Sequence, residues 1–194
     1  MSYHIYNTEG VILSSHLAGD SSRFYNIYTK KLGLVGVWAQ GVRKLESKLR
    51  FNLQDFSHVR IHLVRGKHMW RLIDIETQKK PYNILSLQQK RLVLGRMTSL
   101  LRRLLDEGSD DVLYDLFLSA VAHLDDKSFD MRYLNSFELL FVLRVLHHLG
   151  YGKDSIKEDV ILSYLWNDDV LGYVQERRFY LTKVANISLQ HTHM

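Results

Sequence analysis

Four cations lie close together after residue 42, and their chemistry suits a chain of phosphates. Arg43, Lys44, Lys48 and Arg50 fall within eight residues and are opposed by a single acid, Glu46. Guanidinium and ammonium groups on a flexible connection bind the phosphate backbone of a nucleic acid. Short charge runs are also common on ordinary solvated loops. The segment therefore predicts either a phosphate-binding arm or a simple surface loop.

The residues before this segment predict a strand that carries an outward tryptophan. Val35, Val37 and Ala39 alternate with other residues up to Gly41, which is the pattern of a strand with one buried face. Trp38 belongs to the opposite face, near the basic segment. An exposed tryptophan beside cations can stack on an unpaired base. The alternative is that a helical part of the chain covers Trp38.

Catalytic and metal-binding patterns are missing from the sequence. There is no cysteine, no GxSxG motif and no glycine-rich phosphate loop. His58 and His62 would share a strand face, but at ~3.3 Å per residue they would lie about 13 Å apart, too far for one ion. Paired acids such as Asp110 and Asp111 are explained by helix capping. We therefore expect no enzyme, no catalytic residue, no metal and no cofactor.

Length and charge narrow the class of protein further. The 194 residues allow one large domain or two small ones. Residues 1–80 hold 13 Lys and Arg against 6 Asp and Glu, a net charge of +7, whereas residues 81–194 have a net charge of −2. This asymmetry favours a half that faces nucleic acid. The absence of cysteine, of a signal-peptide pattern and of a long apolar run predicts a cytoplasmic protein without a membrane partner.

Five short strands are predicted in the first 80 residues. They cover 6–17, 23–30, 33–40, 58–64 and 69–76, with a long connection between the third and the fourth. That arrangement is typical of an OB-fold, a small barrel that binds oligonucleotides or oligosaccharides. We therefore expect an OB-fold nucleic-acid-binding domain over residues 1–80.

The rest of the chain is predicted to be helical, which makes the fold class α+β. Pro81 marks a boundary at residues 80–85, and an α-helical bundle domain follows over 85–166. Ser86, Asp110 and Asp130 are the expected caps of the first three helices, and a capping-box pattern at 155–158 starts a fourth. The third helix, apolar on most sides, should be central. Residues 167–194 form a short C-terminal extension compatible with a hairpin or with helix.

Four stretches, in the same order, resemble the RecO family of bacterial recombination mediators. They are Thr8 to Leu13, the Asp20 to Arg23 turn, Gly33 to Phe56, and Phe137 to Leu139 together with Leu149 to Gly152. The resemblance covers about residues 4–155 and identifies the chain as a short, cysteine-free member. Two features depart from the family pattern: Gly36 and Gln40 stand where members often have basic residues, and the four-cysteine zinc module of many members is missing.

The resemblance implies a non-enzymatic DNA-binding protein of DNA repair, in the cytoplasm and associated with the nucleoid. Such proteins bind single- and double-stranded DNA, anneal strands and help to load RecA on DNA coated by single-stranded DNA-binding protein (SSB). Their partners include RecR and the SSB C-terminal tail. By motif, the resemblance assigns phosphate contacts to five residues, namely Arg23, Arg43, Lys44, Lys48 and Arg50. A protein–protein adaptor built from the same two parts, without direct nucleic-acid binding, is the alternative.

Overall fold

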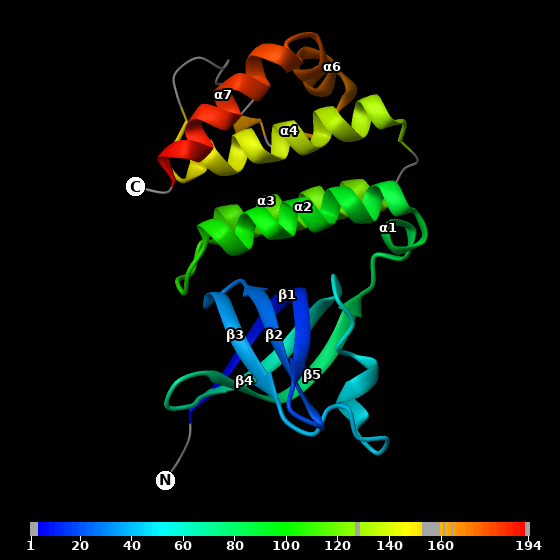
Figure 1. The fold of residues 1–194 in the computed structure, drawn as a ribbon, viewed down its shortest axis with the longest axis vertical. Helices are drawn as coiled ribbons and strands as arrows, with labels where there is room; N and C mark the ends of the chain where they lie inside the picture. The colour runs from blue at the N-terminus through cyan, green and yellow to red at the C-terminus, as the bar shows by residue number, and fades with distance from the viewer. Residues whose placement is uncertain (1–3, 127–128, 153–159, 161, 164, 193–194) are drawn as a thin grey trace. The chain divides into compact units, whose positions relative to one another are not determined.

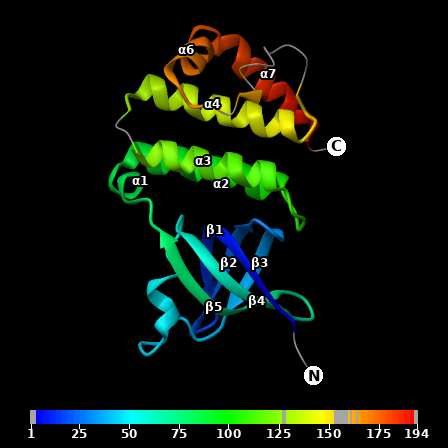
Figure 2. The same ribbon diagram turned by 180° about the vertical axis from the view of Figure 1, so that it is seen from behind.

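The chain divides into two compact units, each described here by itself. The computed structural model describes residues 4–126, 129–152, 160, 162–163 and 165–192. The first unit consists of Met1–Pro81 together with Leu101–Tyr114, and the second of Tyr82–Leu100 together with Asp115–Met194. All five strands lie in the first unit and the second unit is helical, so the predicted α+β class is confirmed (Figures 1 and 2).

Five strands close into a barrel in the first unit, as predicted. They are β1 (Ile5–Ala18), β2 (Ser22–Thr29), β3 (Gly33–Ala39), β4 (His58–Arg65) and β5 (Trp70–Lys79). Their order around the barrel is β1-β2-β3-β5-β4. All neighbouring pairs are antiparallel except β3 and β5, which are parallel. A five-stranded barrel of mixed direction with this order has the OB-like topology that the strand pattern predicted.

Alternation along each strand fills the barrel with apolar side chains. On β3, Val35, Val37 and Ala39 are buried, and on β4 the inward residues are Val59 and its alternate neighbours. Each large aliphatic side chain buried in this way contributes roughly 1.5–3 kcal/mol to folding. Because successive strand residues point to opposite faces, the same register turns Trp38 outward. The barrel core therefore fixes which side chains can meet a ligand.

A short segment between α2 and α3 packs against the barrel and belongs to the first unit. Gly33 forms a bridge with Glu107, the Gly108 N–H donates to the Leu32 carbonyl at 3.0 Å, and the Leu34 N–H donates to Asp106 at 3.0 Å. Gly33 has a φ of 70°, and a Cβ there would lie 2.2 Å from the Gly108 carbonyl oxygen. Only glycine suits this position, so the contact is built into the backbone.

Helices make up the second unit, and α4 is its centre. The described helices are α1 (Tyr82–Ser86), α2 (Gln88–Leu104), α3 (Asp111–Asp126), α4 (Met131–His148), α6 (Asp168–Glu176) and α7 (Arg178–His191). Within this unit α4 packs on α6 and α7, contacts α3 through Phe117 and Phe141, and pairs with α2 through Arg96 and Glu138. The expectation of a central third helix is confirmed (Figure 1).

The helix caps follow the sequence in two cases and depart from it in one. Asp110 accepts a hydrogen bond from the Leu113 N–H at 2.9 Å, and Asp130 accepts one from the Tyr133 N–H at 2.7 Å. Ser86, expected to cap α2, instead ends α1, where its hydroxyl donates to the Asn83 carbonyl. The Ser86 hydroxyl thus binds the preceding turn, in α1, rather than the first turn of α2.

The described residues of the C-terminal extension are mostly helical. Residues 168–176 and 178–191 form α6 and α7, so helix replaces the hairpin that the sequence also allowed. Asn167 caps α6 by accepting from the Val170 N–H at 3.0 Å. The predicted capping box at 155–158 lies outside the described residues.

Candidate nucleic-acid interface

A row of rings crosses the outer face of the barrel. In the strand register His16 lies opposite Phe24, Phe24 opposite Trp38, and Trp38 opposite Arg71. Residues opposite one another in a sheet share a face. The His16 and Phe24 rings have centroids 5.1 Å apart. We call these four side chains, one each from β1, β2, β3 and β5, the outer row.

Gly36 gives the Phe24 ring its place in the outer row. A Cβ on Gly36 would lie 2.4 Å from the Phe24 Cζ. The Phe24 ring therefore lies over β3 at this glycine, next to Trp38. A side chain at position 36 would push the ring off the sheet, so the glycine keeps the aromatic surface close to the backbone.

One end of the outer row borders a hollow. Trp38, Gln40, Lys67 and Arg71 line it together with Ile5, Val64, Arg65, Gly66, Leu72 and Ile73, and its volume is about 820 Å³. An adjoining smaller hollow shares Trp38, Lys67 and Arg71 and adds His68 and Met69. Residues of the loop that joins β4 to β5 thus form one wall. We call the two together the Trp38 hollow; its floor is largely apolar and its edge is cationic.

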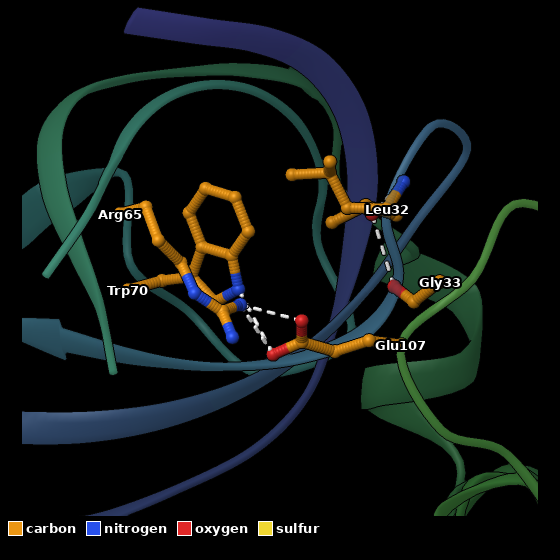
Figure 3. A network of polar contacts seen from close by, with 6 residues as sticks. Leu32, Gly33, Arg65, Trp70 and Glu107 are labelled. Atoms are coloured by element: carbon orange, nitrogen blue, oxygen red, sulfur yellow. Dashed lines mark hydrogen bonds and ion pairs between the residues drawn. The ribbon is translucent and has the colours of Figure 1, made fainter. Parts of the chain in front are cut away.

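The three cations of the Trp38 hollow are not equivalent. The Arg65 guanidinium donates to Glu107, with Nη1 2.7 Å from Oε1, and lies 4.7 Å from the centre of the Trp70 ring (Figure 3). Its charge is therefore largely offset. Among the described residues, neither Lys67 nor Arg71 makes an ion pair. These two side chains can therefore meet an anion.

Arg23, assigned to phosphate by the resemblance, lies on the inward side of β2. It shares its strand face with the buried Tyr25, and its Nη2 donates to the Ser15 hydroxyl at 2.7 Å. That hydroxyl donates in turn to Asp55 at 2.9 Å. Burial raises the pKa of the Tyr25 hydroxyl to about 12, with Arg23 lowering it and Asp55 raising it. Arg23 thus joins β1, β2 and the connection after β3.

Arg43 and Lys44 lie beside the turn between β1 and β2. The Arg43 guanidinium donates to the Asp20 carbonyl at 2.8 Å, and its backbone N–H donates to the Ser21 carbonyl at 2.9 Å. Both side chains are exposed to solvent. Arg43 therefore holds two connections together while part of its guanidinium remains open to a ligand.

Lys48 and Arg50 lie apart from the Trp38 hollow. They belong to a short 3-10 helix, η1 (Lys48–Phe51), which Asn52 fastens to β5 by a 3.1 Å bond from its side-chain amide to the Ile75 carbonyl. Figures 1 and 2 show η1 on the opposite side of the barrel from the β4–β5 loop. Both cations are exposed, and Arg50 lies 5.6 Å from the Phe51 ring centre.

The structure therefore distributes the six predicted residues over several places. Trp38 faces outward on β3, as the alternation predicted, and no cation of the 43–50 segment is among the described residues that line its hollow. Lys67 and Arg71 take that place, and sequence reasoning missed them. A signal existed, because loops between the last two strands of an OB-fold commonly bind ligands.

The described part of the chain offers neither a metal cluster nor a membrane-spanning helix. No group of three or more His, Asp or Glu side chains there is placed to hold a metal ion. None of its helices combines the length and the apolar character needed to cross a bilayer.

Comparison with known proteins agrees with the barrel. Residues 1–80 match the family model "Recombination protein O N terminal". A DNA repair protein RecO of Nocardioides sp. is 30% identical over 73 residues, which is 38% of this chain and 30% of the relative. A RecO of Dehalococcoides mccartyi is 28% identical over 137 residues, 70% of this chain and 54% of the relative. A RecO from a second strain of that species is 27% identical over 124 residues, 63% and 49% of the two chains.

The alignments thus span about half or less of the length of these curated relatives. The family match covers the whole barrel, and the longer alignments continue beyond it into the helices. The barrel topology and the sequence matches agree: residues 1–80, which contain the five-stranded barrel, match the N-terminal domain of the RecO family.

Proposed function

We propose that this chain binds DNA through the outer surface of its barrel. The observation that carries the proposal is the Trp38 hollow, where an outward tryptophan and the cations Lys67 and Arg71 meet on one face. The net charge of +7 over residues 1–80 supports a polyanionic ligand. Arg43, Lys44, Lys48 and Arg50 add phosphate contacts beyond the hollow.

The wider role follows from the family and is part of the same proposal. The chain acts without catalysis as a recombination mediator in DNA repair: it binds single and double strands, anneals complementary strands and assists RecA loading on SSB-coated DNA. RecR and the SSB C-terminal tail are its proposed protein partners. The relatives named above are described as DNA repair proteins, which supports this role.

Salt-dependent binding of a labelled oligonucleotide tests the proposal. Three double variants each remove two charges: Arg43→Ala with Lys44→Ala, Lys48→Ala with Arg50→Ala, and Lys67→Ala with Arg71→Ala. Each lost phosphate contact on a single strand should reduce the slope of log K against log salt by about 0.7. We expect the Lys67 and Arg71 pair to have the largest effect, because these cations flank Trp38.

A matched control removes two exposed cations from α7, Arg178→Ala with Lys183→Ala. This variant has the same net charge as the test variants but leaves the barrel untouched, so its salt slope should equal that of the wild type. Equal slopes for all four variants would refute the assigned contacts. If the wild type shows no binding at low salt, the barrel does not bind DNA.

One observation on the connection between β3 and β4 supports the adaptor alternative. Leu45 and Phe51 are 86% and 70% exposed, and they flank cations on the same connection. Apolar side chains beside cations suit a protein partner with an acidic surface. An adaptor would bind no oligonucleotide in the experiment above, so the same measurement separates the two functions.

A further inference from the structure

We infer that the outer row is a seat for the bases of an unpaired strand, so that the barrel selects single-stranded over duplex DNA by stacking. This inference rests on the proposed DNA binding and adds that the barrel recognises unpaired bases. His16, Phe24 and Trp38 supply the rings, and Lys67 and Arg71 hold the phosphates at the end of the row. No cation of the 43–50 segment is needed for the selection.

The rings of the outer row lie at one level of the barrel surface. Three adjacent strands each present one aromatic or imidazole ring at the same level of the outer face, as the register requires. Adjacent strands lie about 4.8 Å apart. The three rings are therefore presented on one side of the sheet, and every nucleobase has a face that can stack on a ring.

A DNA duplex presents few base faces to such a surface. The faces of paired bases are covered by their neighbours, and only phosphates, sugars and groove edges are accessible. A sheet surface of rings therefore gains little from a duplex, whereas an unpaired strand can turn its bases onto the rings. The cations alone would bind both forms, because charge contacts carry no information on pairing.

The Trp38 hollow is large enough for a nucleobase. Its volume of about 820 Å³ lies within the range of small-ligand sites, roughly 300–1,000 Å³. Ile5 and Ile73 are about half exposed on its apolar floor. Lys67 and Arg71 are at its edge. A base placed against Trp38 would thus have apolar contacts below it and cations within reach of its phosphates.

Three probes of equal length separate stacking from charge: an oligothymidylate of about twelve nucleotides, an abasic strand with the same phosphates, and a blunt duplex. The wild type should bind oligothymidylate about five- to a hundredfold more tightly than the abasic strand, which corresponds to one stacked base or more. Trp38→Ala should remove most of that ratio without changing abasic binding. Trp38→Phe should keep a large part of it.

Gly36→Ala provides a second variant that leaves Trp38 and every cation in place. Its methyl group should displace the Phe24 ring, and the ratio of oligothymidylate to abasic affinity should fall. Lys67→Ala with Arg71→Ala should instead weaken all three probes. Circular dichroism and thermal unfolding would confirm that each variant is folded.

The outcomes also separate this inference from the proposed function. Equal wild-type affinities for oligothymidylate, abasic strand and duplex would overturn the stacking seat while leaving DNA binding intact. A ratio that is unchanged in Trp38→Ala would overturn it as well. A wild type that binds none of the three probes would overturn the proposed function itself.

Discussion

The Trp70 indole N–H donates to the Glu107 carboxylate at 3.1 Å, which joins β5 of the barrel to the segment between α2 and α3. Trp70 is buried and packs edge-on against Tyr6, with ring centroids 5.0 Å apart. Glu107 also pairs with Arg65 (Figure 3). One carboxylate thus satisfies a buried donor and offsets a cation at the border of the proposed DNA site.

Replacing Glu107 should affect stability and DNA binding in opposite directions. Glu107→Ala leaves the indole N–H without its acceptor, which should lower the free energy of unfolding by about 1–3 kcal/mol. Loss of the half-exposed pair with Arg65 adds only ~0–1 kcal/mol. The released Arg65 should at the same time steepen the salt slope of DNA binding by about 0.7. Urea unfolding and salt titration measure the two effects.

Glu107→Gln separates the two roles in that experiment. The amide oxygen can still accept from the indole, so most of the stability should remain, while the charge on Arg65 is released all the same. A glutamine variant as unstable as the alanine variant would contradict the role of the Trp70 bond. An unchanged salt slope would contradict the view that Glu107 neutralises Arg65.

Gly33→Ala should be strongly destabilising. The residue has a φ of 70°, and its added Cβ would meet backbone atoms of Gly108 and Asp106 that cannot move aside like a side-chain tip. Strain of this kind costs of order 1–3 kcal/mol before the steric clash is counted. Gly41→Ala is the matched control, because Gly41 has a φ of 66° but only the Lys44 side chain nearby. Similar denaturation midpoints for the two variants would contradict the close approach.

His58 should make the barrel less stable in acid. Burial lowers the pKa of its imidazole, Glu9 on β1 opposes this, and Lys79 on β5 reinforces it. The unfolded chain therefore takes up the proton first, and stability should be fully present above the ordinary value of 6.5 and fall as the pH drops below it. Arg60, on the same strand, lies 3.7 Å from Glu9, and its positive charge reduces the effect of Glu9 on the pKa of His58.

His58→Gln should flatten that pH dependence. Denaturation midpoints measured on either side of pH ~6.5 would show a smaller difference in the variant than in the wild type. The Glu9 carboxylate lies 3.8 Å from the His58 Nε2, beyond hydrogen-bond distance. Wild-type stability that increases on acidification would mean that Glu9, rather than burial, controls this histidine.

Arg43 allows its charge to be separated from its hydrogen bonds. Arg43→Lys keeps the positive charge but loses the bond of the guanidinium to the Asp20 carbonyl. We expect DNA affinity to stay within about twofold, with a stability loss of about 0.5–1.5 kcal/mol at most. Arg43→Ala should lose affinity as well. Equal DNA binding by both variants and the wild type would remove Arg43 from the interface.

The barrel could be predicted because its signals are local. Val35, Val37 and Ala39 alternate with outward residues, and Gly41 stops the strand, so the sequence pattern alone assigns Trp38 to the outer face. Burial in the structure follows this pattern residue by residue. The observed strand ends differ from the predicted ones by only a few residues, as is usual for boundaries set by fraying and turn geometry.

The composition of the site depends on closure of the barrel, which local patterns do not report. Arg71 becomes a neighbour of Trp38 only through the parallel contact of β3 with β5, across more than thirty residues of chain. A cluster of cations in sequence was the stronger local signal, yet η1 places Lys48 and Arg50 elsewhere on the barrel. The role of Glu107 could not be predicted either, because no local sequence pattern indicates that the connection between α2 and α3 packs against the strands.

The barrel has one narrow seam. Between β3 and β5 the register contains only the pairs Val37–Trp70 and Trp38–Arg71, whereas every other neighbouring pair of strands shares a longer ladder. Local opening starts where few backbone bonds must break. Amide hydrogens along this edge should therefore exchange with solvent faster than those elsewhere in the strands. A strand of DNA that contacts both Trp38 and Arg71 would link β3 to β5 and slow this exchange.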